Sequence, residues 1–300
     1  MSIILITGSS TGIGYATAET LARNGHTVYA TMRNPQRSPQ LQQLVDAQTL
    51  PITILPMDVV DDQSVQNAID RVILKEKQID VLINNAGQGC WGAVEELSMD
   101  LFKADMETNF FGTVRCTKAV LSAMRKRKSG TVINVTSMAG KMYSNFFASY
   151  CASKAATEAF SESLAQELQP FNIKVAIVEP GVVDTPIFSK GNTISEDTYY
   201  SNVKKFLSFF AASLEFHTQP SVVAEVINEI VSGKRTSFRN PAGPDAAPML
   251  GMRAGTLDED WINSVSVSDE DWINSMEQMG LQVRKYMQAA ELPKFSFQNA

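Results

Sequence analysis

Short runs of apolar residues alternate with longer segments of helical period along most of this chain. The runs of strand length lie at residues 3–7, 27–32, 52–57, 81–84, 131–136 and 173–179. Runs such as Ile3–Ile6 and Val175–Val178 are apolar throughout rather than at every second residue, which is typical of strands covered by helices on both faces. The intervening segments, such as 62–76 with one apolar helical face, predict helices. The alternation therefore predicts an α/β fold with a single doubly wound parallel sheet flanked by helices.

The alternation is interrupted at residues 185–217, which are rich in Tyr and Phe and are not followed directly by a strand. The other predicted helices cover residues 13–23, 99–127, 150–168 and 221–231, and a short seventh strand is predicted near 236–238. We expect residues 1–240 to form one domain, with 185–217 as its substrate loop. Residues 241–300 are expected to form a C-terminal helical extension packed on the same domain.

The C-terminal part of the chain contains a near-repeat, Asp-Glu-Asp-Trp-Ile-Asn-Ser, at residues 258–264 and 269–275. Two copies are too few for a repeat architecture. Thr256 and Ser268 each stand three residues before an acidic side chain, which resembles the capping signal at a helix start. We therefore predict two helices whose tryptophans, Trp261 and Trp272, face inward.

The charge of the chain argues against nucleic acid as a partner. Its net charge is −6, and its one basic run, residues 125–128, ends a predicted helix, where it complements the helix dipole. The two histidines, His26 and His217, have no partner at metal-ligand spacing, so no metal is expected. Three widely spaced cysteines indicate reduced thiols, and no apolar run is long enough to span a membrane. We expect a cytoplasmic protein.

A glycine-rich turn joins the first predicted strand to the first predicted helix. It reads Thr-Gly-Ser-Ser-Thr-Gly-Ile-Gly over residues 7–14. Its glycines permit a tight turn and close approach to a pyrophosphate, and the helix that follows offers free N–H groups to the phosphates. Because the turn follows a strand and opens a helix, we interpret it as a dinucleotide-binding loop in a Rossmann-type fold.

The end of the second strand indicates which dinucleotide binds. A loop specific for NAD places an acidic residue there to accept from the ribose 2′-hydroxyl. Here the sequence is Thr31-Met32-Arg33-Asn34, with no carboxylate and with Arg33 available. A guanidinium suits a 2′-phosphate through charge-assisted hydrogen bonds, so we predict NADP(H) as the cofactor.

Tyr150 and Lys154 stand four residues apart in a predicted helix, so their side chains share one face. A neighbouring ammonium should lower the pKa of the phenol and suit Tyr150 to proton transfer. Ser137 lies thirteen residues before Tyr150 and just after a strand, where its hydroxyl can bind the substrate oxygen. The same Tyr-x-x-x-Lys pattern recurs at Tyr200 and Lys204, without a serine at that spacing, and we interpret that copy as surface.

These motifs together resemble the short-chain dehydrogenase/reductase family over about residues 3–240. The resemblance also rests on Asn84-Asn85-Ala86-Gly87 after the fourth strand and on Pro180-Gly181-Val182-Val183-Asp184-Thr185 after the sixth. It implies a catalytic set of Asn109, Ser137, Tyr150 and Lys154, in which Lys154 also holds the nicotinamide ribose and the Asn109 backbone helps to hold a water of a proton relay. The residues expected to bind the cofactor are Gly8, Ser10, Gly12, Ile13, Gly14, Arg33, Asp58, Val59, Asn85, Ala86, Gly87, Tyr150, Lys154, Pro180, Gly181, Val183 and Thr185.

The leading interpretation is an oxidoreductase that interconverts an alcohol and a ketone or aldehyde. Two alternatives stay open: a non-catalytic NADP(H)-binding regulator, and an epimerase or dehydratase acting on a nucleotide sugar. Segment 185–217, with Gln88, Cys90 and Trp91, should line the substrate pocket, and its apolar content favours a lipophilic substrate. The sequence is similar to the hydroxysteroid and retinol dehydrogenase branch. Family members commonly pair through their two long helices, here 99–127 and 150–168, so we expect a homodimer or homotetramer.

Overall fold

Seven parallel strands form one sheet in the computed structural model, which describes residues 1–190, 194–195, 197–216 and 218–293. Their order is β3-β2-β1-β4-β5-β6-β7. The strands are β1 (Ile3–Ile6), β2 (Thr27–Met32), β3 (Ile52–Pro56), β4 (Val81–Asn84), β5 (Gly130–Val135), β6 (Ile173–Pro180) and β7 (Arg239–Ala242). The chain winds outward from β1 to β3 and then crosses to β4, so the predicted doubly wound sheet is confirmed.

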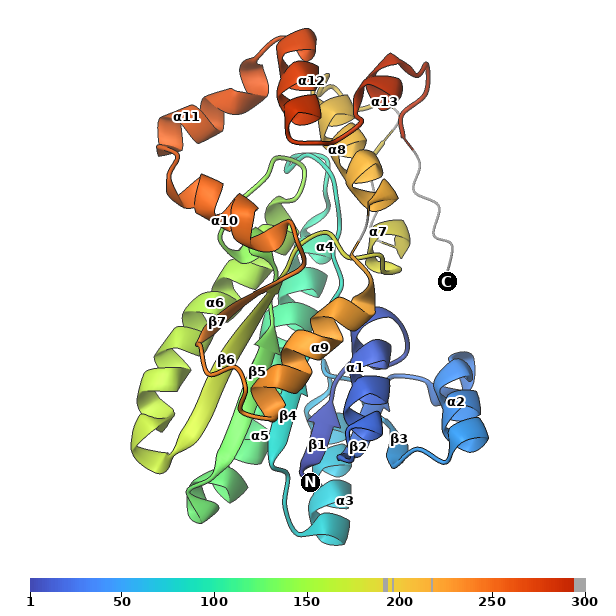
Figure 1. The fold of residues 1–300 in the computed structure, drawn as a ribbon, viewed down its shortest axis with the longest axis vertical. Helices are drawn as coiled ribbons and strands as arrows, with labels where there is room; N and C mark the ends of the chain where they lie inside the picture. The colour runs from blue at the N-terminus through green and yellow to red at the C-terminus, as the bar shows by residue number, and fades with distance from the viewer. Residues whose placement is uncertain (191–193, 196, 217, 294–300) are drawn as a thin grey trace.

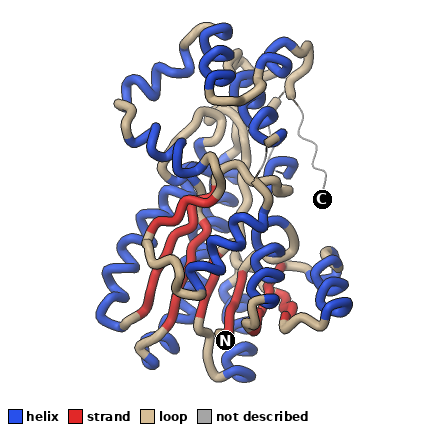
Figure 2. Tube along the Cα trace, in the orientation of Figure 1, coloured by secondary structure: helices blue, strands red, loops and turns tan. Residues whose placement is uncertain are grey.

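Helices cover both faces of this sheet (Figures 1 and 2). One face packs on α1 (Gly12–Arg23), α2 (Gln40–Gln48) and α9 (Pro220–Val231), and the other on α3 (Asp62–Glu76), α5 (Gly112–Arg127) and α6 (Ala148–Leu168). Strand β1 shows why a strand in the middle of this sheet can be apolar at every position. Leu5 points into one core, whereas Ile4 and Ile6 point into the other, and all three are fully buried.

The predicted helix over residues 99–127 is continuous but contains one wider turn. It consists of α4 (Met99–Asp105), a π-helical turn (Met106–Phe111) and α5. Asn109 lies in that turn, and its carbonyl oxygen accepts hydrogen bonds from the hydroxyls of Thr113 and Thr157 at 2.9 and 3.3 Å. Such turns re-aim a residue within a helix and often lie at functional sites.

The seventh strand lies at Arg239–Ala242 rather than at the predicted residues 236–238. It pairs with β6 at the end of the sheet order, so only one of its edges is bonded to a neighbouring strand. An edge strand tolerates a proline, and Pro241 stands within it. The run of Arg, Asn and Pro gives no apolar signal, which is why the sequence pattern misplaced the strand. The strand also runs across the boundary expected at residue 240.

The remaining helices stand at the end of the sheet where the strands finish (Figure 1). They are α7 (Ile187–Lys190), α8 (Val203–Glu215), α10 (Ala246–Ala254), α11 (Asp258–Asn263), α12 (Asp269–Gln278) and α13 (Arg284–Gln288), and short 3₁₀ turns lie at 35–37, 138–140, 169–171 and 264–266. Among the described residues, no helix is long and apolar enough to cross a membrane, and no three potential metal-binding side chains gather. His217 and parts of segment 185–217 lie outside the described residues.

Both copies of the near-repeat are helical, but only one has the predicted cap. The Ser268 side chain accepts from the Asp271 N–H at 3.1 Å at the start of α12. The Thr256 hydroxyl instead donates to the Met252 carbonyl at 2.8 Å, and Leu257 stands at the start of α11. The Thr256 side chain therefore bonds backward to the last turn of α10 instead of capping α11. Both tryptophans are partly buried against apolar clusters, as predicted.

Candidate active site

A pocket of about 1210 Å³ opens along the carboxyl edge of the sheet, where a doubly wound fold places its ligands. Most of the residues predicted to bind cofactor or substrate line it together: Gly8, Ser10, Gly12, Ile13, Arg33, Asp58, Val59, Asn85, Ala86, Gly87, Gln88, Trp91, Ser137, Tyr150, Lys154, Pro180, Gly181, Val183 and Thr185. Gly14 and Asn109 are not part of its lining, although each contacts residues that are: Gly14 packs against Gly8, and Asn109 is hydrogen-bonded to Gln88. Cys90 is also absent from the lining, which corrects its predicted place in the pocket.

The glycine-rich turn has no room for side chains at two of its glycines, Gly8 and Gly14. Gly8 has a φ of 71°, and a Cβ added there would lie 2.7 Å from the Ala86 Cα. A Cβ on Gly14 would lie 2.3 Å from the Gly8 carbonyl oxygen. Ser10, Gly12 and Ile13 line the pocket where α1 begins, and Thr11 provides no side-chain cap for that helix end. The turn thus leaves backbone N–H groups facing a recess, which fits a dinucleotide pyrophosphate.

Thr7 fixes this turn to the neighbouring strand β4, a role that sequence reasoning missed. Its hydroxyl oxygen accepts from the backbone N–H groups of Asn85 and Ala86 at 3.0 and 2.9 Å. The Asn85 side-chain amide donates back to the carbonyls of Thr7 and Gly8, both at 3.0 Å. Arg33 is exposed and lines the pocket after β2, and Asp58 and Val59 line the same pocket after β3.

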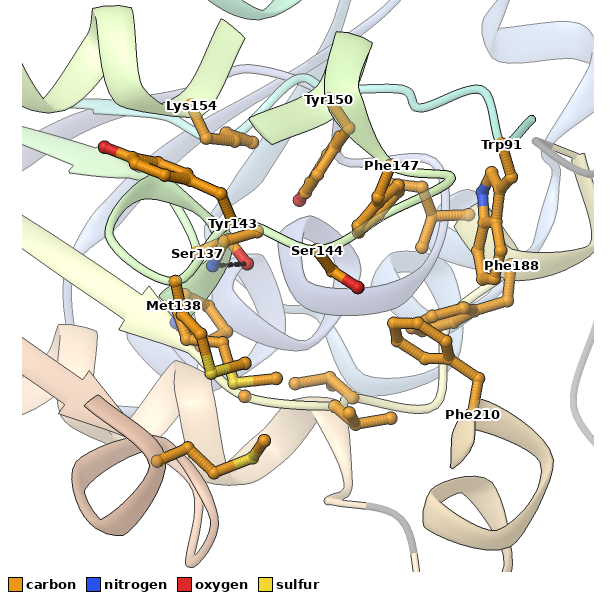
Figure 3. A pocket seen from close by; sticks show the side chains of 18 of the residues that line it. Trp91, Ser137, Met138, Tyr143, Ser144, Phe147, Tyr150, Lys154, Phe188 and Phe210 are labelled. Carbon is orange, nitrogen blue, oxygen red and sulfur yellow. Dashed lines mark hydrogen bonds between the residues drawn. The ribbon is translucent and has the colours of Figure 1, made fainter. Parts of the chain in front are cut away.

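Tyr150, Ser137 and Lys154 line the pocket close to one another (Figure 3). Tyr150 and Lys154 come from the first turns of α6, and Ser137 follows β5. The Ser137 hydroxyl oxygen accepts from the Ala139 N–H at 3.1 Å, which fixes the side chain at the start of a 3₁₀ turn. The Lys154 ammonium lies 5.5 Å from the centre of the Tyr150 ring and donates to the Val135 carbonyl at 3.0 Å.

Burial is the largest influence on the pKa values of Tyr150 and Lys154. It raises the pKa of Tyr150 above its ordinary value, and a hydrogen bond with the Ser137 side chain partly offsets the rise. Burial also lowers the pKa of Lys154 to about 8, against the opposing charges of Glu158 and Asp105. The expected lowering of the Tyr150 pKa by Lys154 is therefore reversed in the structure, because desolvation of the phenolate is the largest influence on this pKa and Lys154 is not among the groups that shift it.

Asn109 braces the loop that follows β4. Its side-chain oxygen accepts from the Gln88 N–H at 2.9 Å, and its amide group donates to the Gln88 carbonyl and to the Ser153 hydroxyl, both at 2.8 Å. A Cβ on Gly87 would lie 3.4 Å from the Asn109 oxygen and 3.6 Å from the Lys154 nitrogen. Asn109 and Lys154 thus meet around the backbone of Gly87.

A buried acid, Asp105, lies behind this loop, and the sequence analysis did not single it out. Its side chain accepts from the Cys90 N–H at 3.2 Å and from the Cys90 thiol at 3.3 Å, so Cys90 turns away from the pocket. Burial raises the pKa of Asp105 and raises that of Cys90 to about 11. An acid within an otherwise helical segment gave no signal of this placement, since only the tertiary fold buries it.

Aromatic side chains form the far wall of the pocket (Figure 3). The Trp91 ring centre lies 5.2 Å from Phe147, 5.1 Å from Phe188 and 5.1 Å from Phe210. The C-terminal helices add further apolar side chains to the lining: Met249, Met252, Trp261, Trp272, Met276 and Met279. The pocket therefore has a polar cradle at one end and a large apolar chamber at the other.

Tyr200 and Lys204 take no part in this site. The Tyr200 hydroxyl donates to the Glu95 carboxylate at 2.8 Å, and the Lys204 ammonium donates to the Ala289 carbonyl at 2.6 Å, both at exposed positions. The second Tyr-x-x-x-Lys copy is a surface feature, as predicted.

Comparison with known proteins agrees with this geometry. The family model for short chain dehydrogenase matches residues 2–196. The chain belongs to the short-chain dehydrogenase family. Members of this family are oxidoreductases that act on CH–OH groups and bind a nicotinamide cofactor.

Similar proteins include a 3-ketodihydrosphingosine reductase of Bacteroides thetaiotaomicron, 38% identical over 81% of this chain and 88% of its own. Retinol dehydrogenase 8 of Bos taurus is 36% identical over 84% of each chain. Among solved structures, a short-chain dehydrogenase from Streptomyces avermitilis is similar with a TM-score of 0.73 and 31% identity, over 93% of this chain and 98% of that one.

Proposed function

We propose that this short-chain dehydrogenase is an NADP(H)-dependent enzyme that interconverts a lipophilic alcohol and its ketone or aldehyde. One observation carries the proposal. The Tyr150 phenol, hydrogen-bonded to Ser137, lies between a glycine-rich cradle and an apolar chamber in a single pocket. Such a position lets one side chain reach a reacting carbonyl between cofactor and substrate.

Tyr150 is the proposed general acid and base. A phenol with the ordinary pKa of 10.0 already carries its proton at neutral pH, and burial raises the pKa of Tyr150 further, so the proton that reduction needs is present on this side chain. In reduction the proton passes from Tyr150 to the substrate oxygen, and in oxidation it returns. Ser137 is proposed to hold that oxygen. The reduced nicotinamide, when bound, supplies the hydride to the carbonyl carbon.

Lys154 and Asn109 are proposed to complete the catalytic set. With a pKa of about 8, Lys154 exchanges protons readily near neutral pH, which suits a residue that restores the proton on Tyr150. It is also proposed to hold the nicotinamide ribose. Asn109 contacts the loop beside Lys154, and that position supports a part for it in the same proton relay.

The cofactor is proposed to lie along the glycine turn and past Asp58, Val59 and residues 85–87 to the edge at 180–185. Arg33 is proposed to bind the 2′-phosphate of NADP(H), because it lies at the pocket rim after β2 and no acidic residue occupies that position.

The substrate is proposed to be apolar. The chamber is walled by Trp91, Phe147, Phe188 and Phe210 and roofed by methionines and tryptophans of the C-terminal helices. The reductase and the retinol dehydrogenase found among the relatives carry apolar substrates in their names, which supports the same class.

We further propose that residues 241–300 are an extension of the same domain and that the enzyme works in the cytoplasm as a homodimer or homotetramer paired through α5 and α6. Light scattering on the purified chain tests the assembly. A monomer at all concentrations would contradict it.

The experiment that tests the reaction follows NADPH and NADH oxidation by the purified protein against long-chain ketones, ketosteroids, retinal and small polar sugars. Reduction of apolar carbonyls that is abolished by Tyr150→Phe is the expected result. Tyr200→Phe is the matched control, because it alters the surface copy of the same motif, and it should keep full activity. Tight NADPH binding without turnover on any carbonyl would favour the non-catalytic alternative.

A further inference from the structure

A second charged side chain of α6 contacts the end of β5, one helical turn beyond Lys154. The Lys154 ammonium donates to the Val135 carbonyl at 3.0 Å, and the Thr136 hydroxyl donates to the Glu158 carboxylate at 2.5 Å. Thr136 lies directly before Ser137. Lys154 and Glu158 together therefore hold the two residues that lead into the serine.

Glu158 lies in the interior with a full set of partners. Its side chain is 1% exposed and pairs with the Arg239 guanidinium. That guanidinium also lies 3.4 Å from the buried Glu179 and donates to Glu162 at 2.9 Å. A Cβ on Gly140 would lie 2.8 Å from the Glu158 Cγ, so the acid packs directly beneath the 138–140 turn. A buried carboxylate is costly unless it is paired in this way.

We propose that Glu158 is a positioning residue that fixes Thr136 and Lys154 beneath Ser137, with the partly exposed Arg239 as its counter-ion. The reaction does not require this acid to touch the substrate. It acts through its neighbours: one carboxylate oxygen holds the strand end, and its negative charge faces the same interior as the lysine. The inference rests on the proposed function of Ser137 and Lys154, but its first test does not need turnover.

Few charged groups surround Lys154 and Glu158 among the described residues. Lys154 is faced by Tyr150 and Glu158 of its own helix and by Asp105 of α4. Glu158 is faced by Arg239 of β7 and Glu179 of β6, and Lys141 acts on Glu179 from the turn above. Burial lowers the pKa of Lys154 to about 8, and the charge of Glu158 is the largest influence that opposes this lowering. Loss of the Glu158 charge should therefore lower the pKa of Lys154 further.

The direct test is an NMR titration of the cofactor-free protein labelled with ¹³C at lysine Cε, with Lys154→Arg to assign the signal. In Glu158→Gln the Lys154 midpoint should fall by roughly one pH unit, as a carboxylate about one turn away would produce. Glu162→Gln is the matched control, because Glu162 binds the same guanidinium but its side chain is 59% exposed. It should leave the midpoint and kcat unchanged. An unchanged midpoint in Glu158→Gln would overturn the proposal.

Turnover gives a second, separable readout. At pH 6.5 Glu158→Gln should lower kcat several-fold with little change in KM, and the alkaline loss of activity should begin about one pH unit earlier. If Glu158→Gln does not fold, Thr136→Val replaces it. That variant should lower kcat without moving the Lys154 midpoint, whereas Thr136→Ser, which keeps the hydroxyl, should restore the rate. Equal rates for Thr136→Val and Thr136→Ser would contradict the proposal.

Failure of this inference differs from failure of the proposed function. If no carbonyl is reduced yet the Lys154 midpoint moves in Glu158→Gln, the proposed function is wrong and the electrostatic link stands. If Tyr150→Phe is inactive but Glu158→Gln titrates and reacts as the wild type does, the function stands and the positioning role is wrong.

Discussion

Phe147 and Tyr150 stack face to face, with ring centres 4.5 Å apart and an interplanar angle of 14°. Phe147 also contacts Trp91 at 5.2 Å, so the phenol that is proposed to donate the proton is held by the wall of the substrate chamber. The Phe147 ring therefore links the wall of the proposed substrate chamber to the proposed proton donor.

Phe147→Leu keeps the pocket apolar but removes the ring that orients Tyr150. We expect kcat to fall on the order of tenfold, because proton transfer needs close alignment. NADPH affinity should change less than twofold, since Phe147 lies in the substrate chamber. Steady-state kinetics with a fluorescence titration of NADPH measures both quantities. A change in affinity without a change in kcat would contradict this reading of the stack.

Lys154→Met should stabilise the fold at neutral pH while abolishing turnover. The folded pKa of Lys154, about 8, lies below the ordinary value of 10.5. Below pH 8 the buried ammonium therefore costs stability. That cost fades between pH 8 and 10.5, where the unfolded chain binds the proton and the folded chain does not. We expect a gain of about 1–3 kcal/mol at pH 7 that shrinks toward pH 10. Urea unfolding at several pH values measures it, and a variant that is less stable at every pH would exclude this account.

Arg33→Ala should discriminate between the two nicotinamide cofactors. If the guanidinium binds a 2′-phosphate, KM for NADPH should rise roughly tenfold or more while KM for NADH stays the same. Arg37→Ala is the matched control, because Arg37 lies exposed in the next 3₁₀ turn and is not part of the pocket lining. Equal changes for both cofactors would show that Arg33 does not read the phosphate.

Gly14→Ala should destabilise the cofactor cradle. The added Cβ would lie 2.3 Å from the Gly8 carbonyl oxygen and 2.5 Å from the Asn85 side-chain nitrogen, so backbone has to move. We expect a loss of about 2–3 kcal/mol together with weaker cofactor binding. Gly251→Ala in α10 is the control, since nothing lies within 4 Å of its added Cβ, and a gain of about 0.5–1 kcal/mol is expected there. Thermal unfolding of the two variants compares them.

The sequence predicts most of the sheet and that Ser137, Tyr150 and Lys154 line one pocket, because these features depend on local patterns. The continuous apolar runs identify strands buried on both faces, and the glycine turn identifies the edge where ligands bind. The strand Arg239–Ala242 escapes prediction because an edge strand carries little apolar signal. Glu158 and Asp105 escape it because nothing in the local sequence shows that their carboxylates are buried.

The pKa of Tyr150 is another property that could not be predicted from the sequence. Spacing on one helix face correctly placed Lys154 near the phenol. Whether an ammonium or desolvation controls the phenol depends on how deeply both are buried, and only the packed structure supplies that depth.

The indole N–H of Trp261 donates to the Tyr143 carbonyl at 2.8 Å, and this bond anchors the C-terminal helices to the loop that leads into α6. The proposed catalytic side chains all lie within residues 2–196, which the family model matches, whereas part of the chamber comes from residues beyond them. The C-terminal helices therefore add to the wall of the chamber without supplying any of the proposed catalytic side chains. Grafting residues 246–288 from a relative should exchange the preferred carbonyl compound and leave the hydride step as it is.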